Sequence, residues 1–279
     1  MDPSLITSSS AAELSAKKIF GAFPRRAEKR FGQNFLFDEK INRKIVSSAG
    51  DLSGKVVAEV GPGPGGLTLE ILKHDIKKLY IVEVDPHWSR VWKNLGASFF
   101  EKSEVIECDA LQCNFKDLAP DVIISNLPYN ISTTLLVKWL KELDFCEKLI
   151  LMFQKEVAER LYAVPATKSY GRLSVLAQSR SRVEKVFDLE PGSFFPAPKV
   201  KSAVLKFTLH SERPCDFCLF SDLLAAVFAH RRKVAVKSLS DFFPDPERVL
   251  VELGYNKNTR AEEISVKDYI ELMRKKNYT

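Results

Sequence analysis

The segment Asn126-Leu127-Pro128-Tyr129 brings together groups that could hold a flat, nitrogen-bearing ring. It directly follows the apolar run 121–125, which is typical of a short buried strand. A strand that only needed to turn could use Asn-Gly or Asp-Gly. This segment offers instead an amide oxygen, a backbone carbonyl fixed by proline, and an aromatic ring. Taken alone, the segment could equally be an Asx-type turn with a core tyrosine.

A glycine- and proline-rich loop, EVGPGPGG at 59–66, follows another apolar run, and Glu83 lies 22 residues after Gly61. Dinucleotide-binding folds place an acidic residue at a similar spacing, but their G-x-G-x-x-G loop offers N–H groups to a pyrophosphate. Here the spacing is G-x-G-x-G, and Pro62 and Pro64 each lack an N–H donor. The loop therefore favours a ligand without phosphate.

S-adenosylmethionine is such a ligand, with a ribose, an adenine, a sulfonium cation and an amino-acid tail. Glu83 could accept hydrogen bonds from the ribose diol, and Asp109, at the end of a third apolar run, could accept one from the adenine amine. Glu59 adds negative charge for a cationic ligand. A tight turn would explain the glycines alone, but the acidic residues at successive strand ends favour a cofactor site. Close approach of the backbone would be provided by Gly61, Gly63 and Gly65.

Strands that alternate with helices are predicted up to about residue 170, which favours a mostly parallel sheet covered on both faces. The predicted strands are 55–60, 78–85, 103–109, 121–125, 148–154, 182–189 and 199–209. Helices are predicted at 38–49, at 67–74, through Trp88 and Trp92, at 132–143, from Lys155, and at 172–179, 220–233, 245–254 and 265–275. We therefore expect an α/β fold: a doubly wound, Rossmann-like sheet with an antiparallel strand pair at its end, and a small all-α domain after it. The expected divisions are a flexible basic tail at 1–28, the sheet domain at 29–211 and the helical domain at 212–279.

The 279 residues are 45% apolar and 28% charged, which is ordinary for a soluble globular protein, and the net charge is +6. Basic residues gather at 17–30 and again at Arg231, Arg232, Lys233 and Lys237, a distribution that suits a polyanion such as RNA as well as a solvated surface. Five irregularly spaced cysteines argue against a disulfide framework. We expect a cytoplasmic protein with reduced thiols, no membrane segment, no metal and no obligate protein partner, and we expect a monomer.

An adenine amine placed at residues 126–129 would be well positioned for methylation. The amine is a weak nucleophile because its lone pair is delocalised into the ring. The Asn126 side-chain oxygen and the Leu127 carbonyl could each accept one N–H, which favours a lone pair aimed at a methyl group. Pro128 would fix that carbonyl, and Tyr129 could stack on a base that has left its helix. Catalysis would then rest mainly on proximity and alignment.

Several longer motifs, in this order, resemble the KsgA/RsmA family of bacterial small-subunit (16S) rRNA adenine N6,N6-dimethyltransferases. The resemblance runs from about residue 29 to residue 209, with a weaker match to the end, and implies dimethylation of two adjacent adenosines near the 3′ end of 16S rRNA. The motifs are RFGQNFL, EVGPGPGGLT, NLPYNIS, QKEVAERL, YGRLSV, FFPAPKVKSAV and HRRK.

The resemblance also implies roles for residues that spacing alone does not reveal. Asn34 and Leu36 would fold over the cofactor, and Phe194 would face the target base opposite Tyr129, with Phe195 as its neighbouring competitor. The family's cofactor contacts fall on Asn34, Leu36, Gly61, Glu83, Asp109 and Asn126. The basic stretch of the helical domain falls on Arg231, Arg232 and Lys233, although KVAVKSL after it departs from the family pattern.

Two other functions remain open at this level. One is the related macrolide-resistance enzyme, which methylates one large-subunit adenine. The other is a non-catalytic nucleic-acid-binding protein like the mitochondrial transcription factors that share this fold. The intact segment 126–129 and Glu83 favour retained catalysis. A dinucleotide oxidoreductase is disfavoured by Pro64 and by the missing third glycine at fingerprint spacing.

Overall fold

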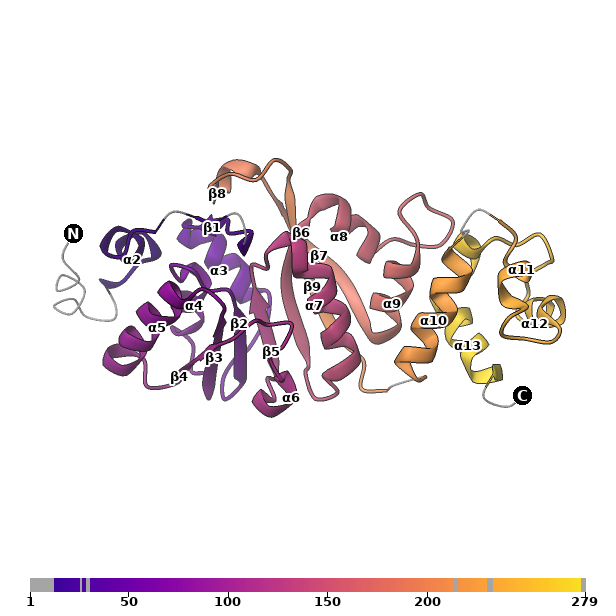
Figure 1. Cartoon of the computed structure of the whole chain (residues 1–279), viewed down its shortest axis with the longest axis horizontal. Helices are drawn as coiled ribbons and strands as arrows, with labels where there is room; N and C mark the ends of the chain where they lie inside the picture. The colour runs from indigo at the N-terminus through magenta and orange to yellow at the C-terminus, as the bar shows by residue number, and fades with distance from the viewer. Residues whose placement is uncertain (1–12, 26, 29–30, 213–214, 230–232, 277–279) are drawn as a thin grey trace. The chain divides into compact units, whose positions relative to one another are not determined.

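A computed structural model describes residues 13–25, 27–28, 31–212, 215–229 and 233–276 (Figure 1). The chain forms two compact units, and the first comprises residues 1–155 and 184–208. The second unit comprises residues 156–183 and 209–279. Within the described ranges, no helix is both long enough and apolar enough to cross a membrane.

A seven-stranded sheet with the order β4-β3-β2-β5-β6-β9-β7 organises the first unit. The strands β4, β3, β2, β5 and β6 are parallel neighbours, and β9 pairs antiparallel with β6. The predicted α/β fold with a mostly parallel sheet and antiparallel pairing at its end is confirmed. The strands are β2 (Val56–Val60), β3 (Lys78–Glu83), β4 (Ser103–Glu107), β5 (Val122–Ser125), β6 (Lys148–Gln154), β7 (Ser181–Leu189) and β9 (Ser202–Leu209).

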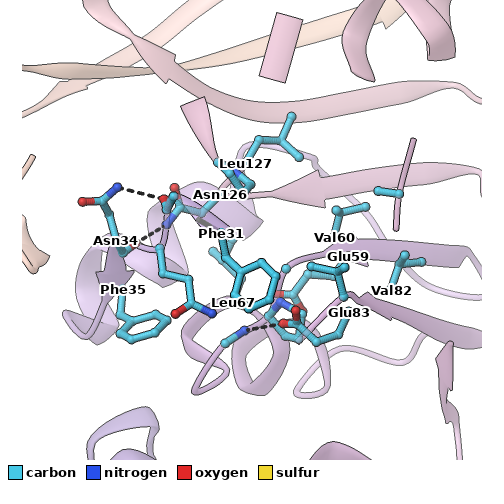
Figure 2. A pocket seen from close by; sticks show the side chains of 18 of the residues that line it. Phe31, Asn34, Phe35, Glu59, Val60, Leu67, Val82, Glu83, Asn126 and Leu127 are labelled. Atoms are coloured by element: carbon cyan, nitrogen blue, oxygen red, sulfur yellow. Dashed lines mark hydrogen bonds between the residues drawn. The ribbon is translucent and has the colours of Figure 1, made fainter. Parts of the chain in front are cut away.

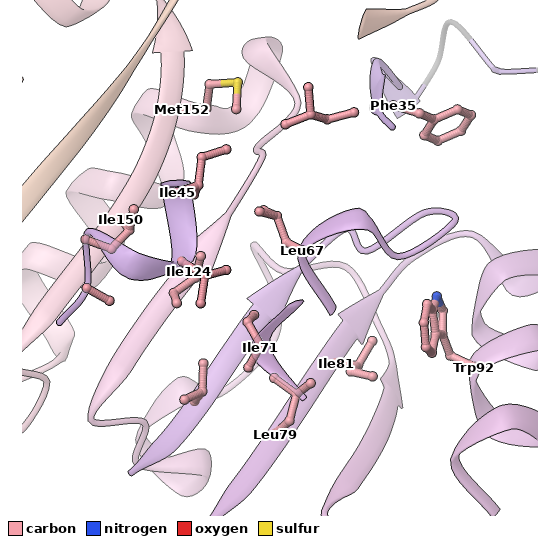
Figure 3. Packing of buried hydrophobic residues seen from close by; sticks show 14 of the residues in the cluster. Phe35, Ile45, Leu67, Ile71, Leu79, Ile81, Trp92, Ile124, Ile150 and Met152 are labelled. Atoms are coloured by element: carbon pink, nitrogen blue, oxygen red, sulfur yellow. The ribbon is translucent and has the colours of Figure 1, made fainter. Parts of the chain in front are cut away.

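Helices between the strands bury one apolar face against the sheet. Asp38 caps the first of them, as predicted, by accepting hydrogen bonds from the backbone N–H groups of Lys40 and Ile41. The side chains of Ile45 and Ile71 belong to one buried cluster with residues of the central strands (Figure 3). These helices are α3 (Glu39–Ser47), α4 (Gly66–Ile71), α5 (Pro86–Phe99), α6 (Phe115–Leu118) and α7 (Tyr129–Glu142).

Several small elements in the first unit were not predicted, among them α6 and the three described next. Strand β1 (Phe35–Leu36) pairs antiparallel with β8 (Phe194–Phe195) and forms a separate two-stranded sheet. Helix α2 (Ala16–Ala22) lies inside the expected flexible tail, yet Ile19 is fully buried in the hydrophobic cluster. The structure therefore differs from the sequence expectation over residues 13–25, because burial of apolar side chains holds this helix in place.

The second unit is helical, but its limits differ from the expected domain at 212–279. Residues 156–183 join the C-terminal helices because α9 (Arg172–Arg180) packs against two of them. Within this unit the Tyr170 hydroxyl donates a hydrogen bond to the Ile264 carbonyl. The remaining helices are α8 (Lys155–Leu161), which begins at the end of the first unit, α10 (Phe217–Phe228), α11 (Ala235–Leu239), α12 (Pro246–Glu252) and α13 (Val266–Lys276).

Candidate cofactor and acceptor site

A pocket lies at the carboxyl ends of the parallel strands of the first unit (Figure 2). It is lined by the loops after β2, β3, β4 and β5, and by residues 31–36 before and within β1. Parallel sheets bind ligands at this edge because the strand ends and the following loops converge there. The predicted cofactor residues all line this one cavity: Asn34, Leu36, Gly61, Gly63, Glu83, Asp109 and Asn126.

The glycine loop owes its shape to close packing against Trp92. Gly65 has a φ of +89° and forms the N-cap of α4, and a Cβ there would lie 1.9 Å from Cζ2 of Trp92. The indole Nε1 of Trp92 donates a hydrogen bond of 2.8 Å to the Gly63 carbonyl oxygen. A side chain at Gly65 therefore meets both an unfavourable backbone conformation and a steric block.

Two buried carboxyl groups line the pocket beside this loop. Glu83 accepts hydrogen bonds from the backbone N–H of Asp85 at 2.8 Å and of Gly63 at 3.4 Å. Burial raises the pKa of Glu83 to about 7 and that of Glu59 to about 8, and the charge on Glu83 adds to the shift at Glu59. The Glu59 Oε2 atom is buried without a hydrogen-bond partner among the described residues. Glu59 is therefore mostly protonated near neutral pH, and a cation bound beside it would favour the ionised form.

The raised pKa of Glu59 predicts a pH-dependent stability for the cofactor-free protein. A carboxyl pKa that is higher in the folded state stabilises the fold fully below the unfolded value of 4.5, and this contribution is lost as the pH rises through about 8. At about 1.4 kcal/mol per pKa unit, the free energy of unfolding should fall by several kcal/mol over this range. In the Glu59→Gln variant that fall should be smaller, and the part that remains would come from Glu83, whose pKa burial also raises.

Urea denaturation at pH 5, 6, 7 and 8 measures this difference. Glu39→Gln, a substitution of an exposed carboxylate in α3, is the matched control and should keep the wild-type slope. Parallel slopes for the wild type and Glu59→Gln would contradict the assignment of the pH dependence to Glu59.

The Asn126 side chain is held in a defined orientation at the end of β5. Its Nδ2 donates a hydrogen bond of 2.8 Å to the Asn34 carbonyl oxygen, and Asn34 Nδ2 donates to the Gly32 carbonyl at 3.1 Å (Figure 2). Since the amide nitrogen is used in this way, Oδ1 is the acceptor that Asn126 can offer to a ligand. In the first turn of α7, Ile131 and Ser132 donate their backbone N–H groups to the Pro128 carbonyl. The Leu127 carbonyl oxygen therefore accepts no hydrogen bond from these two N–H groups.

The two predicted aromatic residues do not line the pocket. Tyr129 begins α7, where its hydroxyl shares a hydrogen bond with the Ser202 hydroxyl, and burial raises its pKa. Phe194 is 5% exposed and belongs to the hydrophobic cluster, whereas Phe195 is 55% exposed. Adjacent residues of a strand point to opposite faces, so the pairing of β8 with β1 turns one ring inward and the other outward.

The structure also places residues that the sequence reading missed or could not place. Trp92 and Ser202 were not assigned roles, although the i, i+4 spacing of Trp88 and Trp92 was a signal that both rings share one helix face. Lys233 is exposed at the surface of the second unit. Arg231 and Arg232 lie outside the described residues.

Comparison with known proteins agrees with this geometry over nearly the whole chain. The family model described as ribosomal RNA adenine dimethylase matches residues 25–277. The protein named ribosomal RNA small subunit methyltransferase A from Ruegeria sp. (strain TM1040) is 40% identical, with 92% of this chain and 95% of the relative covered. Its namesake from Dinoroseobacter shibae is 41% identical over the same shares.

Solved structures extend the comparison to the fold. A dimethyladenosine transferase from Plasmodium falciparum superposes with a TM-score of 0.77 at 28% identity, covering 88% of this chain and 98% of that chain. The 23S rRNA methyltransferase ErmE superposes with a TM-score of 0.67, but at 23% identity it shows a shared fold alone. Taken with the family match and the 40% identical relatives, these findings show that the chain belongs to the ribosomal RNA adenine dimethylase family.

Proposed function

We propose that this chain transfers methyl groups from S-adenosylmethionine to N6 of two adjacent adenosines near the 3′ end of 16S rRNA, in the small ribosomal subunit. The observation that carries the proposal is the single pocket that Glu83 and Asn126 share, with the Asn126 amide fixed so that its oxygen can accept. The relatives at about 40% identity, which are named small-subunit methyltransferases, support the choice of subunit.

The residues of the pocket suit S-adenosylmethionine. Burial raises the pKa of Glu59 and of Glu83, and a cationic ligand beside these two carboxyl groups would favour their ionised forms. Pro62 and Pro64 remove two of the N–H donors that a pyrophosphate would need. We propose that Glu83 binds the ribose diol, Asp109 the adenine amine, and that Gly61 and Gly63 allow close backbone approach. The segment with Asn34 and Leu36 would cover the ligand.

When bound, the cofactor supplies an electrophilic methyl group. The part of this chain is to orient the acceptor amine: Asn126 Oδ1 and the Leu127 carbonyl each accept one N–H of the N6 amine. This arrangement would aim the nitrogen lone pair at the methyl group; as the N–C bond forms and the S–CH3 bond breaks, S-adenosylhomocysteine would be the leaving group, and the N6 proton would pass to solvent. Pro128 fixes the carbonyl, so the rate gain comes from alignment rather than from a strong base.

Tyr129 is the proposed stacking partner of the target base, and its hydrogen bond to Ser202 fixes the ring. On the resemblance, Phe194 is the proposed ring opposite it. In β8 the Phe194 ring is buried in the hydrophobic cluster, so any role of this ring opposite the base depends on where β8 lies. The placement of β8 would then matter for the acceptor side of the reaction.

We propose that the helical second unit contacts the rRNA, with Arg231, Arg232 and Lys233 as phosphate-binding residues. Replacing Arg231 and Arg232 by Ala should weaken binding to small subunits and reduce the slope of log K against log salt by about 1–2. Binding titrations between 50 and 200 mM salt measure this slope. An unchanged slope would remove both residues from the interface.

We further propose a monomer that acts in the cytoplasm, where its ribosomal substrate is assembled.

Radiolabelled S-adenosylmethionine tests the proposed function directly. Small and large subunits that lack the modification are incubated in parallel with the protein, and the rRNA is digested and examined for N6,N6-dimethyladenosine. Label at two adjacent adenines of the small subunit alone is the expected result. Label in the large subunit alone would move the protein to the macrolide-resistance type. Absence of label despite measured cofactor binding would favour a non-catalytic RNA- or DNA-binding protein.

A further inference from the structure

Helix α2 precedes residue 25, where the family model begins, and yet it is built into the first unit. Ser15 caps it by accepting a hydrogen bond from the Lys18 backbone N–H, and Ile19 is fully buried. After the helix, the Phe23 carbonyl lies 3.3 Å from Nε2 of His87. Arg25 forms an ion pair with the buried Asp85, with Nε 3.1 Å from Oδ2. The buried face of α2 therefore holds the helix against the core, and the contacts of Phe23 and Arg25 hold the segment after it against the start of α5.

The ring of Phe20 on this helix is the centre of an aromatic cluster. Its ring centroid lies between 5.5 and 6.3 Å from those of Phe35, Phe37, Trp88 and Phe195. The ring of Phe195 also lies near that of Phe37, at 6.4 Å. Edge, tilted and stacked contacts of this kind have preferred geometries, so the cluster restrains the rings that it joins.

This cluster connects the two sides of the proposed reaction. In the β1–β8 ladder Phe35 pairs with Phe195 and Leu36 with Phe194. On the β1 side Phe35 lines the pocket, and its Cε1 would lie 2.8 Å from a Cβ at Gly63. On the β8 side the chain continues into the loop at 194–200, where Phe195 and Val200 are exposed. Phe20 thus contacts one ring on the cofactor side and one on the acceptor side.

We propose that α2 is a positioning element for methyl transfer, and that Phe20 is its positioning residue. Phe20 holds Phe195, and with it β8 and the 194–200 loop, in register with the segment that covers the cofactor. The 194–200 loop therefore keeps its place beside β1 only while α2 is docked. The identification of the cofactor and of the acceptor base rests on the proposed function. The packing that links α2, β1 and β8 does not depend on it.

Hydrogen exchange on the full-length protein tests this link without any RNA. In Phe20→Ala, exchange in peptides covering residues 31–37 and 194–200 should become roughly tenfold faster than in the wild type, while peptides covering β6 should be unchanged. Lys17→Ala, on the exposed face of the same helix, is the matched control and should leave all three peptides unchanged. Faster exchange everywhere in Phe20→Ala would show only a loss of global stability and would overturn the proposal, as would unchanged exchange at 194–200.

Kinetics provide the second readout, with Phe20→Leu as the variant that keeps an apolar side chain if Phe20→Ala does not fold. Because residues 31–36 line the cofactor pocket, dissociation constants for S-adenosylhomocysteine should rise about threefold, while kcat on small subunits should fall about tenfold. Equal losses in cofactor affinity and kcat would contradict a role on the acceptor side. If the wild type methylated no small subunits but the exchange pattern held, the proposed substrate would be wrong and the role of α2 would stand.

Discussion

Replacing Asn126 by Ala should lower the rate of methyl transfer by about 100-fold, or more, with little loss of stability. The substitution removes Oδ1. In the wild type the hydrogen bond from Asn126 Nδ2 to the Asn34 carbonyl oxygen orients this atom. A preorganised hydrogen bond at a reacting group is typically worth about 10²–10³ in rate. Single-turnover measurements, with enzyme and cofactor at saturating excess over the small subunits, isolate this step from substrate binding and product release.

Two further variants make this result specific. Asn130→Ala removes an exposed amide from the first turn of α7 and should keep the wild-type rate. Asn126→Asp keeps an acceptor oxygen but loses the N–H that reaches Asn34, so it should fall between the wild type and Asn126→Ala. Turnover of Asn126→Ala within twofold of the wild-type rate would sink the proposed orientation of the amine.

Replacing Gly65 by Ala should have the largest effect on the cofactor loop. The new Cβ would lie 1.9 Å from Trp92 Cζ2 and would sit on a backbone with a φ of +89°. Overpacking in a core typically costs about 1–3 kcal/mol, and a left-handed backbone about 1–2 kcal/mol more for a residue with a Cβ. We expect a loss of about 3 kcal/mol in the free energy of unfolding, together with loss of cofactor binding.

Gly54→Ala separates the two causes. Gly54 also has a positive φ, of +69°, but no atom lies within 4 Å of its Cβ position, so this variant reports the backbone term alone. The double variant Gly65→Ala with Trp92→Leu makes room for the methyl group and should recover part of the loss relative to Trp92→Leu alone. Urea denaturation measures all four proteins. Equal losses for Gly65→Ala and Gly54→Ala would contradict the packing of Trp92 beneath the loop.

Most of the sheet could be predicted from the sequence because its strands are short apolar runs between polar turns. The run LILMF in β6 and the run VVAEV in β2 are examples. The two-residue strands β1 and β8 carry no such periodicity, since they exist only because distant segments meet. Helix α2 was assigned to a tail because it is short and basic, and its burial depends on an apolar surface that the rest of the unit creates.

The residues of the site also fall into those that the sequence could predict and those that it could not. Glu83, Asp109 and Asn126 could be predicted because each lies at the end of a strand or within two residues after it, and parallel strand ends share one edge of a sheet. Asn34 and Leu36 precede the sheet and required the resemblance. Which ring of the Phe194–Phe195 pair turns inward could not be read from SFFPAP, because that depends on the register with β1.

The place of β9 between β6 and β7 has a consequence for synthesis on the ribosome. Strand β6 ends at Gln154, but its antiparallel partner begins only at Ser202 and ends at Leu209. Because the ribosome adds about 5–20 residues per second, the edge of β6 stays unpaired for roughly 3–10 s before β9 has been synthesised. An apolar strand with an unpaired edge is a template for aggregation. Nascent chains that stall between these two strands should therefore be early targets for chaperones and proteases.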